Sequence, residues 1–203
     1  MKAIIYPVSS LCSLVIGLVL LFVFHQNASE EIDELLITSF NIDAGSKYWI
    51  LALFSYLVPG LLTLVLTIKH WKTFRKGFEN YTTSLLLLTL AMLWLSFGII
   101  RFDPEDEIST LNQIGRSIAA QVIIFFLFLF GTISTSNYSK NKILKKTMIL
   151  LVALYILCLI LMFSILEVYS FYMLNFIFLL CFIWLILFAK FIEERDSAKK
   201  TPN

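Results

Sequence analysis

The sequence predicts an all-helical integral membrane protein, a bundle of six transmembrane helices with both termini in the cytoplasm. The 203-residue chain is 59% hydrophobic and only 15% charged, whereas soluble domains are usually about 45–50% apolar and about 25% charged. Its charged residues are confined to tails, connections and the ends of the apolar runs. Six such runs, each close to the ~20 residues that cross a bilayer core, cover residues 4–24, 48–68, 83–100, 117–135, 147–166 and 169–191.

The connections between these runs alternate in the sign of their charge, which predicts the orientation. If both termini are cytoplasmic, every Lys and Arg except Lys47, Arg101 and Arg116 faces the cytoplasm, as the positive-inside rule requires. We therefore predict a multi-pass protein of the plasma (cytoplasmic) membrane with a basic inner face and an acidic outer face. Membrane lipids are the expected partners. The sequence lacks an arginine-rich patch with interleaved aromatic residues, so we expect no binding to nucleic acid.

No internal repeat or composition break divides the chain. Residues 1–191 are predicted to form a single transmembrane domain. The charged segment 192–203 is predicted to be a cytoplasmic tail, disordered beyond a helix stub. The first run is longer than the 7–15 apolar residues of a signal peptide, so we expect it to remain as a permanent helix.

Proline and capping residues mark the first two helices and their connection. Pro7 lies in the first turn of the first run, where a proline is tolerated. Ser29 precedes two glutamates and is typical of a helix N-cap, so residues 29–40 are predicted to form a short helix on the outer surface. Pro59-Gly60 interrupts the second run and predicts a kink. It is either a packing feature or part of a helix that lines a cavity or moves.

Polar residues enter the outer halves of the fourth and sixth runs. Gln121 lies about one turn inside the membrane from Arg116, and an amide at that depth needs a partner or a wet cavity. The turn around Glu167 is short, so the fifth and sixth helices are predicted to be antiparallel neighbours. Asn175 lies on the sixth run at a depth similar to that of Gln121.

The histidines and cysteines exclude several kinds of site. His25 and His70 are predicted at opposite membrane faces, so no metal site and no cofactor is expected. With no histidine inside a span, a serine nucleophile would have no base. The absence of an acid or base inside a span also argues against ion-coupled transport. The three cysteines occur without a C-x-x-C pair and are interpreted as packing residues: Cys12, Cys158 and Cys181.

The two outward arginines are the candidate binding residues. The planar forks of Arg101 and Arg116 suit a phosphate or a carboxylate, although pairing with adjacent acids or extension to the interface would also explain them. We hypothesise that they hold an anionic headgroup, with Gln121 and Asn175 as hydrogen-bonding neighbours. The acidic residues between Arg101 and Arg116 lack the spacing and the glycine of a calcium loop. They are interpreted mainly as solvated charges. Whether the protein is an enzyme is left open, and the only candidate acid–base groups are Asp103 and Asp106.

Two outer segments suggest a family. Phe102-Asp103-Pro104-Glu105-Asp106, followed by Gly115-Arg116-Ser117-Ile118-Ala119-Ala120, resembles the outer-loop pattern of the family called domain of unknown function 998. Asn41-Ile42-Asp43-Ala44-Gly45 is similar to a second stretch of that family. This chain has Asp103 and Pro104 in reversed order, and Arg116 where the family has a histidine. The resemblance implies a six-span plan and an association with lipids, without a defined reaction.

These observations predict an outward-facing polar pocket that binds or handles a lipid or a lipid-like anionic amphiphile. Two alternatives stay open. One is a non-enzymatic membrane subunit that docks a protein partner on the outer face through its acidic loops. The other is a passive carrier for amphiphiles, which only the Pro59-Gly60 break supports.

Overall fold

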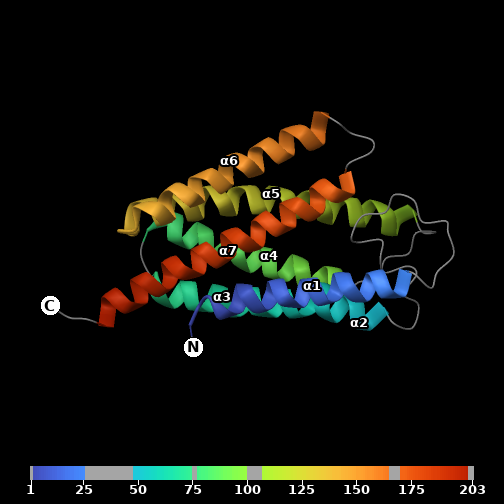
Figure 1. Ribbon diagram of the computed structural model, residues 1–203, viewed down its shortest axis with the longest axis horizontal. Coiled ribbons are helices and arrows are strands. Elements are labelled where there is room, and N and C mark those ends of the chain that lie inside the picture. The colour runs from blue at the N-terminus through green and yellow to red at the C-terminus, as the bar shows by residue number, and fades with distance from the viewer. Residues whose placement is uncertain (1, 26–47, 75–76, 100–106, 165–169, 201–203) are drawn as a thin grey trace.

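The computed structural model describes residues 2–25, 48–74, 77–99, 107–164 and 170–200, and this part of the chain is helical without any strand (Figure 1). The all-helical prediction is confirmed for these residues, whereas the expected surface helix at 29–40 lies outside them. The elements are α1 (Ile5–His25), α2 (Tyr48–Ala52), the π-helical turn η3 (Leu53–Leu57), α3 (Val58–Thr73), α4 (Phe78–Ile99), α5 (Glu107–Tyr138), α6 (Lys142–Ser164) and α7 (Ser170–Lys200).

Four of the described helical segments are long and apolar enough to cross a membrane, which fits a membrane-embedded protein. They correspond to the second, third, fourth and fifth predicted runs. The first run contributes a shorter apolar helix, Ile5–Leu20. The four segments are Leu53–Thr73, Phe78–Ile99, Ile118–Tyr138 and Lys142–Leu161.

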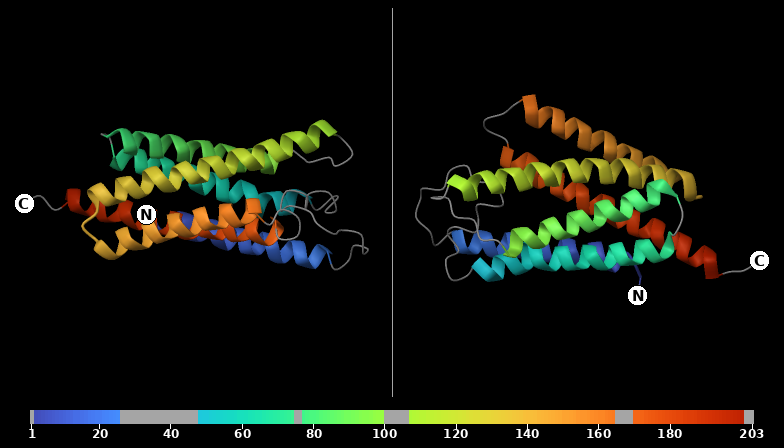
Figure 2. Two further views of the ribbon diagram at one scale, coloured as in Figure 1. Left: turned by 90° about the horizontal axis from the view of Figure 1, so that it is seen from above. Right: turned by 180° about the vertical axis from the view of Figure 1, so that it is seen from behind.

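The helices lie along the long axis of the molecule, and α7 crosses them diagonally (Figures 1 and 2). It contacts α1, α3, α5 and α6, while α4 packs against both α3 and α5. The start of α1, the end of α7, the facing ends of α3 and α4, and the facing ends of α5 and α6 all lie toward one end of the bundle. We call this the basic end, because Lys72, Lys142 and Lys146 lie there.

Stacked aromatic rings join α5 to α7 in the core. The Trp184 ring lies 5.0 Å from the Phe128 ring and 4.8 Å from the Phe188 ring, measured between centroids. Its indole N–H donates to Thr132 Oγ1 at 3.3 Å. The same ring packs directly over Gly131, so that a Cβ atom at that position would overlap it. Gly131 therefore sets how closely α5 and α7 approach.

The break predicted at Pro59-Gly60 is present as the π-helical turn η3. The Val58 N–H bonds to Leu53 O, and Pro59 has no N–H, so Phe54 O is left without a backbone donor. Ser13 of α1 donates its hydroxyl to Phe54 O at 2.7 Å. A neighbouring helix thus satisfies the released carbonyl, as a membrane interior requires. This arrangement favours the packing interpretation of the break.

We expect Ser13→Ala to destabilise the protein by about 1 kcal/mol more than Ser10→Ala, because it leaves a carbonyl of η3 unpaired. Ser10 is the matched control, since its hydroxyl donates within its own helix, to Tyr6 O at 2.9 Å. Thermal unfolding in detergent measures the difference. Equal losses for the two variants would show that the bond to η3 carries no special weight.

The segment predicted to be a disordered tail is helical: α7 continues without a break through residues 192–200. Two glutamates of this part have tertiary partners. Glu193 Oε1 accepts the Ile4 N–H at 2.9 Å, and Glu194 Oε2 accepts the Ser139 hydroxyl at 3.0 Å. These bonds tie the described end of α7 to the N-terminal segment and to the α5–α6 connection.

Candidate functional site

Arg116, the predicted anchor for an anionic group, lies on α5 and contacts the end of α4. Its Nη1 donates to Ser96 O at 3.3 Å, and its Nε donates to Asn112 O at 3.4 Å. The guanidinium carbon lies 5.4 Å from the centroid of the Phe97 ring, a cation–π distance. The half-buried side chain is therefore oriented by a carbonyl and a ring, at the end of the bundle opposite the basic end.

Gln121 lies one to two turns further along α5 and contacts a different helix. The Tyr155 hydroxyl of α6 donates to Gln121 O at 2.7 Å and lies 3.2 Å from Gln121 Oε1. The Gln121 Nε2 atom is buried without a hydrogen-bond partner. The hydrogen-bonding neighbour of the amide oxygen is thus the Tyr155 hydroxyl, whose single proton is better placed for the backbone carbonyl. Arg116 therefore contacts α4 through Ser96 and Phe97, whereas Gln121 contacts α6 through Tyr155.

The remaining candidates are only partly covered by the structure. Arg101, Asp103 and Asp106 lie outside the described residues. Asn175 is placed on α7, but its side chain is outside the described part. Within the described residues, no group of three or more His, Cys, Asp and Glu side chains could hold a metal ion. The three cysteines are free.

Sequence reasoning missed a buried polar cluster at the basic end. His70 of α3 is fully buried, and its Nδ1 lies 2.7 Å from Ser84 Oγ of α4. Ser134 of α5 donates its hydroxyl to Asn80 Oδ1 of α4 at 2.6 Å. These side chains link three helices through buried hydrogen bonds, which stabilise helix contacts in membranes.

The prediction that no histidine lies within a span to pair with a serine is wrong for His70. The candidate span Leu53–Thr73 includes it, because α3 continues beyond residue 68, where the apolar run was taken to end. The His70 ring packs 4.8 Å from the Phe74 ring and 5.1 Å from the Phe188 ring. Its Nε2 is buried without a hydrogen-bond partner. The one sequence signal for a buried histidine was the position of His70 directly after a hydrophobic run.

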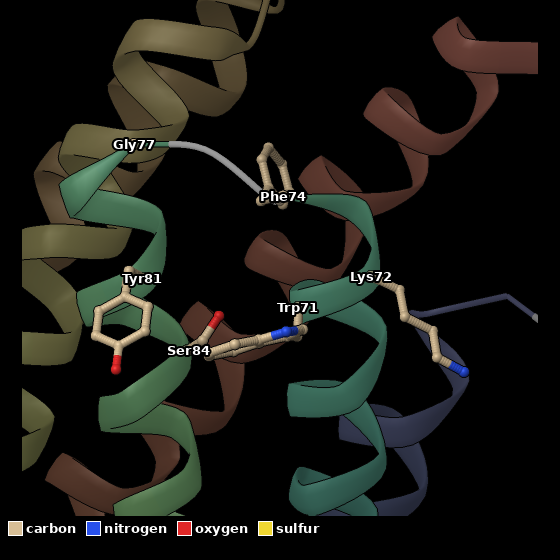
Figure 3. A pocket seen from close by; sticks show the side chains of 6 residues that line it. All are labelled: Trp71, Lys72, Phe74, Gly77, Tyr81 and Ser84. Carbon is tan, nitrogen blue, oxygen red and sulfur yellow. The ribbon is translucent and has the colours of Figure 1, made fainter.

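A cavity of about 370 Å³ opens between α3 and α4 beside this cluster (Figure 3). The Trp71 indole reaches from α3 toward Ser84 on α4, and the Lys72 side chain points away from α4. Three of the six lining residues are aromatic, and Ser84 contributes a hydroxyl. The lining residues are Trp71, Lys72, Phe74, Gly77, Tyr81 and Ser84.

Gly77, which directly precedes α4 and lines this cavity, has a backbone conformation that favours glycine. Its φ is +104°, a conformation that glycine adopts easily and other residues rarely do. A Cβ atom there would lie 2.9 Å from Asn80 Nδ2 and 3.1 Å from the Tyr138 hydroxyl. The residue at position 77 is therefore restricted by both its backbone conformation and its packing.

The chain matches no known protein family, no curated protein and no solved structure. The resemblance to the domain of unknown function 998 family therefore rests on the quoted residues alone.

Proposed function

We propose that the chain is a six-span protein of the plasma membrane, with both termini cytoplasmic, that binds the headgroup of an anionic lipid or a lipid-like amphiphile at its outer end. The two ends of the described chain lie at the same end of the bundle, which supports an even number of crossings. Lysines cluster at that same end, which supports a cytoplasmic basic end.

The observation that carries the proposal is the setting of Arg116. Ser96 O and the Phe97 ring hold its guanidinium where α4 and α5 meet, at the proposed outer end. A planar guanidinium matches the oxygens of a phosphate. Because its orientation is already set, little side-chain entropy is lost on binding. Arg101 and Asn175 remain proposed contacts of the same headgroup, with Asp103 or Asp106 as the proposed acid–base groups, whereas Gln121 faces α6.

We expect Arg116→Gln to weaken retention of phosphatidylglycerol about tenfold, since a charge-assisted hydrogen bond is lost. Native mass spectrometry of the purified protein, titrated with this lipid, measures the retention. Arg116→Lys should retain an amount of lipid between that of the wild type and that of Arg116→Gln, because lysine keeps the charge but lacks the planar guanidinium. Lys146→Gln is the control, since it removes one exposed charge at the opposite end. Unchanged retention in Arg116→Gln, or an equal loss in Lys146→Gln, would contradict the proposal.

The structure favours neither alternative over this function. The carrier was supported by the Pro59 break, whose released carbonyl is satisfied by Ser13. The acidic segments proposed to dock a partner lie largely outside the described residues.

A further inference from the structure

The hydroxyl of Ser84 bonds a different kind of group from the hydroxyls of Thr83 and Thr89 on the same helix. Thr83 and Thr89 donate to the carbonyl four residues earlier, at 2.6 and 2.9 Å. Ser84 instead pairs across the helix contact with His70 Nδ1, and it lines the cavity. Its proton position therefore depends on the tautomer of the histidine.

The unpartnered Nε2 atom of His70 indicates which tautomer is present. If Nδ1 accepted a proton from Ser84, a neutral ring would carry an N–H at Nε2, buried without an acceptor. Unpaired buried N–H groups are rarer in proteins than unpaired acceptors. The less costly arrangement has the proton on Nδ1, donating to Ser84 Oγ. The serine O–H is then available to donate to a group in the cavity.

The rest of the cavity suits an amphiphile at a membrane surface. Its volume of about 370 Å³ lies in the usual range of ~300–1,000 Å³ for ligand sites. Trp71 and Tyr81 are 51% and 57% exposed, their rings are 5.5 Å apart, and such residues favour the headgroup level of a bilayer. Lys72 supplies positive charge at the rim, although its side chain points away from α4 in Figure 3.

We propose that this cavity binds the phosphate-bearing headgroup of an anionic lipid from the leaflet at the basic end. Ser84 donates its hydroxyl proton to a phosphate oxygen, the rings of Trp71 and Tyr81 lie together beside the glycerol region, and Lys72 raises the local positive potential. His70 is a positioning residue that orients the Ser84 hydroxyl. The site lies at the opposite end of the bundle from Arg116 and does not depend on the function proposed there.

Quenching of Trp71 fluorescence tests this site. The full chain carrying Trp49→Phe is placed in phosphatidylcholine nanodiscs with a rising fraction of phosphatidylglycerol brominated near the glycerol. Trp94 and Trp184 are buried, and adding Trp71→Phe gives the background that they contribute. We expect saturable quenching of Trp71 at a lower lipid fraction than brominated phosphatidylcholine requires. Equal quenching by the two lipids would overturn the proposal, because it indicates contact with bulk lipid only.

Variants of the polar groups separate this site from nonspecific charge attraction. Ser84→Ala should raise the half-quenching fraction about tenfold, the effect of one lost hydrogen bond to a charged group, and Ser84→Thr should restore the wild-type value. His70→Leu should match Ser84→Ala, whereas His70→Asn, which keeps a donor, should recover part of the binding. An unchanged fraction in a folded Ser84→Ala protein, or an equal fraction in Ser84→Ala and Ser84→Thr, would contradict the proposal.

Two further comparisons identify the source of the phosphate and the site that responds. Lys146→Gln and Arg116→Gln should leave the quenching of Trp71 unchanged. The outer site at Arg116 and the cavity at Ser84 can therefore be contradicted independently of each other. Reversal of the quenching by inorganic phosphate would show that the cavity recognises the anion itself. Persistence of the quenching in phosphate would show that the lipid is needed. A change in quenching in Lys146→Gln as large as that in Ser84→Ala would overturn the assignment to the cavity.

Discussion

Gly131→Ala is expected to lower the free energy of unfolding by about 2 kcal/mol, because the added methyl group overlaps the ring of Trp184. That ring is fully buried and is stacked between Phe128 and Phe188. It cannot move without disturbing both neighbours and its hydrogen bond to Thr132. Thermal or denaturant unfolding in detergent micelles, followed by tryptophan fluorescence, measures the change.

Gly115→Ala is the matched control on the same helix. A Cβ atom there meets nothing within 4 Å, and alanine is the better helix former by roughly 1 kcal/mol. Its stability should therefore be unchanged or slightly raised. If Gly131→Ala were as stable as Gly115→Ala, the close approach of α5 and α7 would be incorrect.

Gly77→Ala is expected to cost about 2 kcal/mol for two separable reasons. An alanine is strained at a φ of +104°, and its methyl group would press on the Asn80 side chain. Asn80 is buried and accepts the hydroxyl of Ser134, so it has little freedom to yield. The same unfolding measurement applies.

A double variant distinguishes the two causes. Asn80→Ala removes the nearest steric neighbour, so in that background Gly77→Ala should cost less, and the remaining loss is the backbone strain together with the contact to the Tyr138 hydroxyl. If Gly77→Ala lowered the free energy of unfolding no more than Gly115→Ala does, position 77 would not be restricted by its backbone conformation and packing.

The positions of the helices follow well from the sequence, but some of their ends do not. The apolar runs predict where α3, α4 and α5 lie, since apolar length dominates in a membrane. The run ends at residues 68 and 83 stop short of the helix ends, because His70 and Asn80 look like loop residues in a hydropathy pattern. Both are inside helices because Ser84 and Ser134 on neighbouring helices satisfy them.

The sequence indicated individual residues of the candidate site but not which of them lie close together. Arg116 and Gln121 could be selected because topology does not explain them, but the helix that each one faces depends on tertiary packing. His70 and Ser84 are fourteen residues apart, and no local periodicity indicates that they meet. The end of α7 was misjudged for the same reason, since the partners of Glu193 and Glu194 lie far away in the chain.

We propose that the basic end faces the cytoplasm and that the Arg116 end faces outward. Labelling of single cysteines tests this orientation. Starting from a chain with the three native cysteines replaced by alanine, Asn112→Cys and Lys142→Cys place exposed thiols at opposite ends of the bundle. We expect a membrane-impermeant maleimide to label Asn112→Cys in intact cells and Lys142→Cys only after permeabilisation. Labelling of Lys142→Cys in intact cells, with Asn112→Cys protected, would contradict this orientation.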